Sequence, residues 1–215
     1  MKKIVVIFFL FIIPFANLIA QDPNRFDEDI KKFTEIAISK GEELTVFTGS
    51  SSIRFWEQLQ TDCNNTKVIN TGFGGSHMSD LLYFLEETVL RFQPDHVYIY
   101  EGDNDIAAEK DLEDILKTAE QITAKILASN PKIKIHFMSA KPSPSRWKYK
   151  EKYLAFNSLL KTYCNSHKQL SYIDVWHPML AKNGRPIPNI FISDSLHMNR
   201  QGYLLWKDII CSDFE

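Results

Sequence analysis

The sequence predicts an α/β fold, a three-layer α/β/α sandwich around a doubly wound, parallel sheet of five strands. Short apolar runs typical of buried strands alternate along the chain with longer segments whose apolar residues recur at helical spacing. No linker, repeat or low-complexity segment interrupts this alternation, so residues 21–215 are expected to form one domain. Crossovers between parallel strands are right-handed, which leaves few topologies open.

Composition supports a globular domain and argues against one class of partner. Hydrophobic residues make up 44% of the 215 residues and charged residues 24%, which is close to the globular average. The chain has 25 Lys and Arg against 27 Asp and Glu, a net charge of −2, and no basic run. This balance argues against nucleic acid as the main partner.

The first twenty residues are identified as a secretory signal peptide. Two lysines precede an apolar run over residues 4–13, and Ala20 ends the segment before a polar stretch. The run is too short to span a bilayer comfortably, and Pro14 follows it. We expect a secreted or periplasmic protein without stable membrane insertion after cleavage of residues 1–20. An uncleaved anchor is the alternative, because the cleavage site is imperfect.

The first third of the mature chain contains two expected strands and two expected helices. Residues 27–39 are expected to be helical because Ile30 and Phe33 lie on one side. The apolar run 44–48 predicts a buried strand that ends at Gly49, and a helix is expected over 51–59. The second strand is expected over 67–70 and is followed by a glycine-rich turn.

The rest of the chain continues the alternation. Apolar residues at helical spacing from Met78 to Val89 precede a third strand, expected over 96–100. The expected elements that follow are a helix with an apolar face from 112 to 126, stopped by Asn130 and Pro131; a strand over 133–138; a helix over 147–164; a strand over 170–175; and a final helix over 199–212.

The loops after the carboxyl ends of the expected strands carry residues suited to ester hydrolysis. Such loops meet at one edge of a parallel sheet and build its site. Ser51 is a candidate nucleophile, His197 a candidate base and Asp194 a group to orient the imidazole. The backbone amides of Ser51 and Gly75 and the side chain of Asn104 are candidate donors to an oxyanion. Each motif alone is ordinary, but together they indicate a hydrolase.

From about Leu44 to its end, the chain resembles the SGNH hydrolases, or GDSL-type esterases and lipases. The matching segments are 46–56, 69–76, 102–105 and 194–197. The resemblance implies that Ser51 is the nucleophile, that Gly75 and Asn104 complete the oxyanion hole, and that the Asp-x-x-His motif supplies the rest of the triad. Ser50 replaces the aspartate of the family's Gly-Asp-Ser motif. Ser50 and Ser52 therefore remain alternative nucleophiles.

The substrate is predicted less narrowly than the reaction. The resemblance implies an ester, and the family includes lipases, lysophospholipases, thioesterases and carbohydrate acetylesterases. An exported domain without an amphipathic lid favours a short acyl group, such as acetyl on a glycan, over the longer chains of a lysophospholipase or thioesterase. Two non-enzymatic alternatives are a flavodoxin-like FMN carrier, with a phosphate held by residues 48–52, and a glycan-binding module.

His77 and Trp147 are further candidates for substrate contact. His77 follows the oxyanion glycine closely, although a plain surface role is an equal alternative. Trp147 ends a proline-pinned loop, where packing into the core is the alternative. The segment 174–177 is interpreted as structural. No cofactor is expected, and no HExxH motif, carboxylate cluster or histidine pair suggests a metal.

Three cysteines, Cys63, Cys164 and Cys211, do not form a disulfide framework, because they are odd in number and far apart. Free or buried thiols are expected. A single bridge between two of them is the alternative, and the sequence does not identify the pair.

Overall fold

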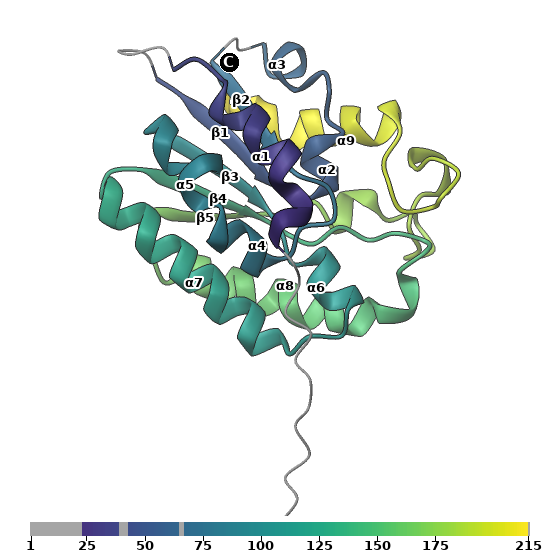
Figure 1. Cartoon of the computed structure of the whole chain (residues 1–215). Helices are drawn as coiled ribbons and strands as arrows, with labels where there is room; N and C mark the ends of the chain where they lie inside the picture. Colours follow the sequence, from purple (N-terminus) through teal and green to yellow (C-terminus); the bar gives the residue numbers. More distant parts are fainter. Residues whose placement is uncertain (1–22, 39–42, 65–66, 215) are drawn as a thin grey trace, which may run out of the picture.

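A five-stranded parallel sheet lies at the centre of the computed structural model, which describes residues 23–38, 43–64 and 67–214 (Figure 1). The strands are β1 (Thr45–Gly49), β2 (Val68–Gly72), β3 (His96–Tyr100), β4 (Lys134–Met138) and β5 (Leu170–Ile173). Their order is β2-β1-β3-β4-β5, and every pair is parallel. The predicted fold class is confirmed, and the order is that of a flavodoxin-like doubly wound sheet.

Helices cover both faces of the sheet, as Figure 1 shows for α7 and α8 on one side and α9 on the other. The α-helices are α1 (Asp27–Thr34), α2 (Ser51–Arg54), α3 (Leu59–Asp62), α4 (Met78–Tyr83), α5 (Leu85–Thr88), α6 (Asp103–Ala107), α7 (Leu112–Ser129), α8 (Lys150–Asn165) and α9 (Arg200–Ile210). Short 3-10 turns are η1 (Pro23–Phe26), η2 (Leu90–Phe92), η3 (Trp147–Tyr149), η4 (His177–Met179), η5 (Pro188–Ile190) and η6 (Cys211–Phe214).

Alternate residues of the strands supply two separate cores. Val46 of β1 packs with the core beneath α1, α4, α7 and α8, whereas Phe47 packs with the core beneath α2, α3 and α9. In β3, Val97 likewise packs in the first of these cores and Tyr98 in the second. Successive side chains of a strand point to opposite faces, and helices cover both faces here. Continuous apolar runs rather than alternating ones therefore predicted these strands.

Several helices are shorter or more broken than their periodicity predicted. The helix that begins at Ser51 ends at Arg54, and the Asn70 side-chain amide binds the carbonyl oxygen of Ile53 at 2.7 Å, which ends the run before Leu59. The predicted 27–39 helix ends at Thr34. Residues 101–105, expected as a loop, contain the start of α6, because Gly102 has a φ of +95° and acts as its N-cap.

The expectation of three thiols is wrong for two of the cysteines. Cys63, just after α3, and Cys211, just after α9, form a disulfide between residues 148 positions apart. The fold brings these two helix ends together, which sequence spacing does not reveal. Cys164 is a free, buried thiol, and burial raises its pKa to about 12.

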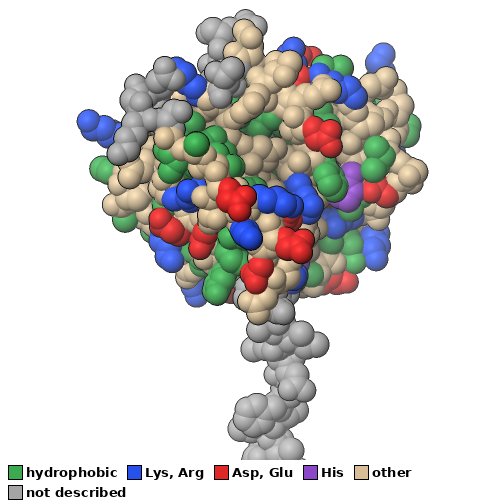
Figure 2. Space-filling model, turned by 45° about the horizontal axis from the view of Figure 1, so that its top comes forward, with side chains coloured by type: hydrophobic (Ala, Val, Ile, Leu, Met, Phe, Trp, Pro, Cys, Tyr) green, Lys and Arg blue, Asp and Glu red, His purple; other side chains and the backbone are tan. Residues whose placement is uncertain are grey.

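One face of the molecule is mixed in charge (Figure 2). Figure 2 shows cationic and anionic side chains interspersed over one face of the molecule. Within the described ranges, no helix combines the length and apolar character that crossing a bilayer requires.

Candidate active site

Ser51 and His197 lie within hydrogen-bonding distance at the carboxyl edge of the sheet. Ser51 begins α2, directly after β1, and its Oγ is 3.0 Å from Nε2 of His197. Nδ1 of the same imidazole is 2.5 Å from Oδ2 of Asp194. The structure therefore brings together a hydroxyl, an imidazole and a carboxylate in the order that nucleophilic catalysis requires.

The loop that carries Asp194 and His197 is held in place from two sides. Oδ1 of Asp194 accepts hydrogen bonds from the backbone amides of Leu196 and His197, both at 2.9 Å. Nζ of the buried Lys141 donates to the Leu196 carbonyl oxygen at 2.9 Å. Desolvation opposes the charge of Asp194, but hydrogen bonds from the His197 ring and these amides outweigh it and lower the pKa of Asp194 to about 2. Asp194 is thus ionised at neutral pH.

The three consecutive serines have different surroundings. Ser50 and Ser52 are 2% and 3% exposed, and Ser50 Oγ accepts a hydrogen bond from Asn104. Only the middle residue, Ser51, faces His197 and lines the pocket described below. The adjacent Thr48 is also buried. Because most hydroxyls of this segment are turned into the protein, it does not form the open cradle that an FMN phosphate needs.

A pocket of about 350 Å³ opens over Ser51, and we call it the Ser51 pocket. Its lining residues are Ser51, Arg54, Phe55, Gly74, Gly75, Asp103, Asn104, Arg146, Leu196 and His197. They come from the segments that follow β1, β2, β3 and β4, and from the loop before α9 that carries Leu196 and His197. Two of the ten lining residues, Phe55 and Leu196, are large and apolar.

Gly75 and Asn104, the two further candidate oxyanion donors, line this pocket. Gly75 has a φ of +80°, which favours glycine, and a Cβ added there would meet no atom within 4 Å. A substrate oxygen can therefore approach the Gly75 backbone closely. The side-chain amide of Asn104 donates to the carbonyl oxygen of Ser76 and to Oγ of Ser50, both at 2.8 Å.

Arg146 is a pocket residue that the sequence does not single out. Its guanidinium donates to Oδ1 of Asn104 at 2.8 Å and to Oδ1 of Asp103 at 2.6 Å. Burial opposes ionisation of Asp103, but the charges of Lys141 and Arg146 outweigh it and lower the pKa of that carboxyl. The sequence does point to the loop that carries Arg146, because Trp147, the next residue, was a candidate for substrate contact. The prediction chose the aromatic residue rather than the arginine beside it.

The structure places neither His77 nor Trp147 in the Ser51 pocket. His77 is buried at the N-cap of α4, and its Nδ1 is 3.2 Å from Oδ1 of Asp105. Trp147 stacks on Trp176, with ring centroids 6.0 Å apart, and packs against the core. Both side chains are thus occupied by the protein itself. Arg146 takes the place at the pocket that was predicted for Trp147.

A buried acid is hydrogen-bonded to the loop that carries Gly75 and Ser76. Glu101, at the end of β3, is 1% exposed and hydrogen-bonded to the hydroxyl of Ser76. Burial, reinforced by the charge of Asp105, raises the pKa of Glu101 well above its usual range. Glu101 is therefore expected to be neutral beneath Gly75 and Ser76.

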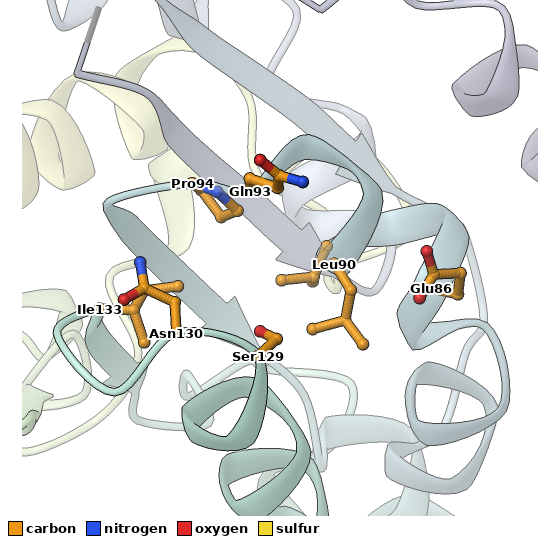
Figure 3. Close-up of a pocket in the computed structure, with 8 residues that line it drawn as sticks. Glu86, Leu90, Gln93, Pro94, Ser129, Asn130 and Ile133 are labelled. Atoms are coloured by element: carbon orange, nitrogen blue, oxygen red, sulfur yellow. The ribbon is translucent and has the colours of Figure 1, made fainter. Parts of the chain in front are cut away.

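Other groups in the described part of the chain do not form a second reactive centre. Asp174 and His177 are hydrogen-bonded at 2.6 Å, but both side chains are exposed. A cavity of about 550 Å³ lies at the opposite edge of the sheet, before β3 and β4, and Figure 3 shows its lining of Glu86, Leu90, Ser129 and neighbouring residues. Among the described residues, no cluster of three or more His, Cys, Asp or Glu side chains is arranged to hold a metal ion.

Comparison with known proteins points in the same direction as this geometry. The model of the GDSL-like Lipase/Acylhydrolase family matches residues 38–205. No curated protein matches the chain.

Three solved structures share the fold. A candidate acylhydrolase from Bacteroides fragilis has a TM-score of 0.77 and 21% identity, covering 91% of this chain and 98% of its own. A GDSL-like lipase from Bacteroides thetaiotaomicron gives 0.76 and 20%, with coverages of 90% and 98%. A variant of an acetyl xylan esterase from Geobacillus stearothermophilus gives 0.61 and 16%, with coverages of 82% and 96%.

Proposed function

Because the chain belongs to the GDSL-like Lipase/Acylhydrolase family and is a carboxylic ester hydrolase, we propose that it cleaves esters through an acyl-enzyme on Ser51. The observation that carries this proposal is the 3.0 Å contact between Ser51 Oγ and His197 Nε2, with Asp194 on the other ring nitrogen. A serine hydroxyl is a weak nucleophile until an adjacent base removes its proton, and this arrangement provides that base.

The reaction follows in two steps. Ser51 Oγ attacks the ester carbonyl carbon while its proton passes to Nε2 of His197, and Asp194 stabilises the imidazolium. The carbon–oxygen bond to the alcohol then breaks, and the alcohol oxygen takes that proton. A water molecule, deprotonated by His197, attacks the acyl-enzyme, which releases the carboxylic acid and restores the Ser51 hydroxyl.

Three N–H groups are proposed to bind the oxyanion: the backbone amides of Ser51 and Gly75 and the side-chain amide of Asn104. Fixed donors directed at a developing charge supply much of the rate enhancement in acyl transfer. In the free protein both N–H groups of Asn104 have partners. The oxyanion is proposed to share the N–H that is bound to Ser50 Oγ, because a charged acceptor is stronger than a hydroxyl.

The acyl group is proposed to be short, with acetyl on a glycan as the favoured substrate. The Ser51 pocket has a volume of about 350 Å³, and only two of its ten lining residues are large and apolar. A long acyl chain gains its binding energy from buried apolar area, which these walls do not offer. The acetyl xylan esterase among the similar structures also supports an acetylated carbohydrate. Longer acyl chains, as in a lysophospholipase or thioesterase, are the alternative.

Rates on 4-nitrophenyl acetate and 4-nitrophenyl octanoate test the acyl preference. We expect kcat/KM to be at least tenfold higher for the acetate, with no turnover of either ester by Ser51→Ala. A preference for the octanoate would contradict the short-chain proposal, while leaving the Ser51 mechanism intact.

The enzyme is further proposed to be exported, as a secreted or periplasmic protein. The signal-peptide pattern in residues 1–20 supports this, and those residues lie outside the described ranges. Mass spectrometry of the native protein is expected to find a mature chain that begins at Gln21. A full-length chain in the cell would contradict export.

A further inference from the structure

A second hollow adjoins the Ser51 pocket, and we call it the Phe55 groove. It has a volume of about 250 Å³ and is lined by Phe55, Trp56, Glu57, Gln58, Met198, Asn199, Arg200 and Tyr203. Phe55 is the residue that lines both hollows, and its side chain is 43% exposed. The two hollows therefore meet at Phe55, beside the place where the ester carbon is expected to lie.

The positions of the oxyanion donors and of His197 determine the direction in which the alcohol leaves. In the tetrahedral intermediate, the oxyanion faces Gly75 and Asn104, whereas the leaving oxygen must face Nε2 of His197 to receive its proton. The ring of Phe55 packs against the His197 ring in an edge-to-face contact, with centroids 5.0 Å apart. The alcohol portion of the ester thus emerges beside Phe55.

Two buried aromatic residues lie beneath the Phe55 groove. The rings of Trp56 and Tyr203 are stacked at a centroid distance of 5.6 Å. Their polar atoms already have partners inside the protein: the Trp56 indole N–H donates to Asp62, and the Tyr203 hydroxyl donates to the carbonyl oxygen of Ser52. Trp56 and Tyr203 are only 1% and 6% exposed, so they form a packed base beneath the groove. The exposed ring of Phe55 is the aromatic surface that a ligand can reach, and such carbon surface suits the C–H face of a sugar ring.

The rim of the groove is polar and carries no net positive charge. Glu57 and Gln58 are exposed there, with one carboxylate and one amide able to bind hydroxyl groups. The guanidinium of Arg200 is engaged by both carboxylate oxygens of the buried Asp62, each at 2.5 Å. Because Asp62 neutralises Arg200 and Glu57 is anionic, a phosphate-bearing alcohol is disfavoured here.

From this placement we propose that the Phe55 groove is the leaving-group subsite and binds one neutral sugar unit of an acetylated carbohydrate. The sugar packs on the exposed ring of Phe55, and its hydroxyls hydrogen-bond to Glu57 and Gln58. The proposal rests on the proposed esterase function, and it specifies which part of the substrate determines specificity. A sugar ring has an apolar C–H face and polar hydroxyl groups at its edge. An aromatic ring flanked by polar side chains can bind both.

The test compares two acetate esters that differ only in the alcohol: a mono-acetylated methyl pyranoside and 4-nitrophenyl acetate. The variant is the double substitution Glu57→Ala/Gln58→Ala. We expect it to lower the ratio of kcat/KM for the pyranoside over kcat/KM for the aryl ester by about tenfold, the effect expected for loss of one or two hydrogen bonds to substrate. An unchanged ratio overturns the proposal.

A matched control and a third substrate complete the experiment. Glu120→Ala/Gln121→Ala removes the same pair of residue types from the exposed side of α7, and the ratio is expected to stay as in the unmodified enzyme. An acetyl ester of glycerophosphocholine is expected to be a poorer substrate than the pyranoside, and the reverse order overturns the proposal. Failure of the unmodified enzyme to hydrolyse even 4-nitrophenyl acetate refutes the esterase function itself, so the two failures are distinguishable.

Discussion

Arg146 donates a hydrogen bond to Oδ1 of Asn104 at 2.8 Å, across 42 positions of sequence. The same guanidinium is anchored on Asp103 at 2.6 Å. An asparagine amide can be held in either of two orientations, and a donor on Oδ1 fixes the one that directs the N–H groups away from Arg146. These N–H groups then face Ser76 and Ser50, at the edge of the Ser51 pocket.

We predict that Arg146→Ala lowers kcat on 4-nitrophenyl acetate by about tenfold to hundredfold, because a charge-assisted hydrogen bond that orients Asn104 is lost. KM is expected to change little, since the contact acts on the oxyanion donor. Steady-state kinetics separate the two constants.

The matched control is Lys148→Ala, which removes an exposed cation two residues further along the chain. It is expected to keep the full rate. Partial recovery of Arg146→Ala by added guanidinium ion would support the positioning role. A rise in KM with an unchanged kcat would instead show that Arg146 acts on substrate binding alone.

Removal of the proposed oxyanion donor itself gives a larger effect. Asn104→Ala is predicted to lower kcat by about 10²–10³-fold, the usual result of losing one such donor. Circular dichroism is expected to show an intact fold, because Asn104 lies at the pocket surface rather than in either core. Turnover near that of the unmodified enzyme would exclude Asn104 from the oxyanion hole.

Glu101 predicts that the protein loses stability as pH rises above about 4.5. Its pKa is raised in the folded state, so the fold keeps a proton that the unfolded chain releases above about pH 4.5. Stability contributed by this group is therefore present below that pH and is lost as pH rises toward the folded-state pKa. Glu101→Gln mimics the neutral acid, and its Tm relative to the unmodified enzyme is expected to increase from pH 5 to pH 9. A difference in Tm independent of pH would contradict a neutral Glu101.

His136 predicts that the protein loses stability as pH falls below about 6.5. Burial, with the neighbouring His96, lowers its pKa to about 4 from 6.5, so the unfolded chain binds a proton in this range that the fold does not. Stability should fall as pH decreases from about 6.5 to about 4, by at most about 3 kcal/mol from this group. Urea unfolding of His136→Gln is expected to show a smaller loss between pH 7 and pH 4. An equal loss in both proteins would assign the acid sensitivity to other groups.

The strands were predictable because each is a short apolar run buried on both faces, and the loops that follow them could be placed at one edge of the sheet. Ser51, Gly75, Asn104, Asp194 and His197 were predicted from their positions in these loops together with the family resemblance. The sequence alone did not reveal that Asn70 ends the helix after Ser51, that Gly102 starts a helix or that Cys63 meets Cys211. The helix end near Asn70 and the disulfide depend on contacts between distant segments, and the start at Gly102 depends on a positive φ.

The residues at the pocket wall show the same limit. His77 has the spacing of a pocket residue, but its ring pairs with Asp105 from the next loop. Arg146 became recognisable only when Asn104 and Asp103 were found beside it. Spacing along the chain predicts which residues are near an edge, and packing decides which of them face the pocket.

Reaction with a fluorophosphonate, followed by peptide mass spectrometry, tests the central claim most directly, because the reagent phosphonylates a serine whose hydroxyl is activated by a neighbouring base. The account predicts one adduct, on Ser51, that is abolished by His197→Ala and retained in Ser52→Ala. An adduct on Ser50 or Ser52, or an unmodified protein that still hydrolyses 4-nitrophenyl acetate, would contradict it.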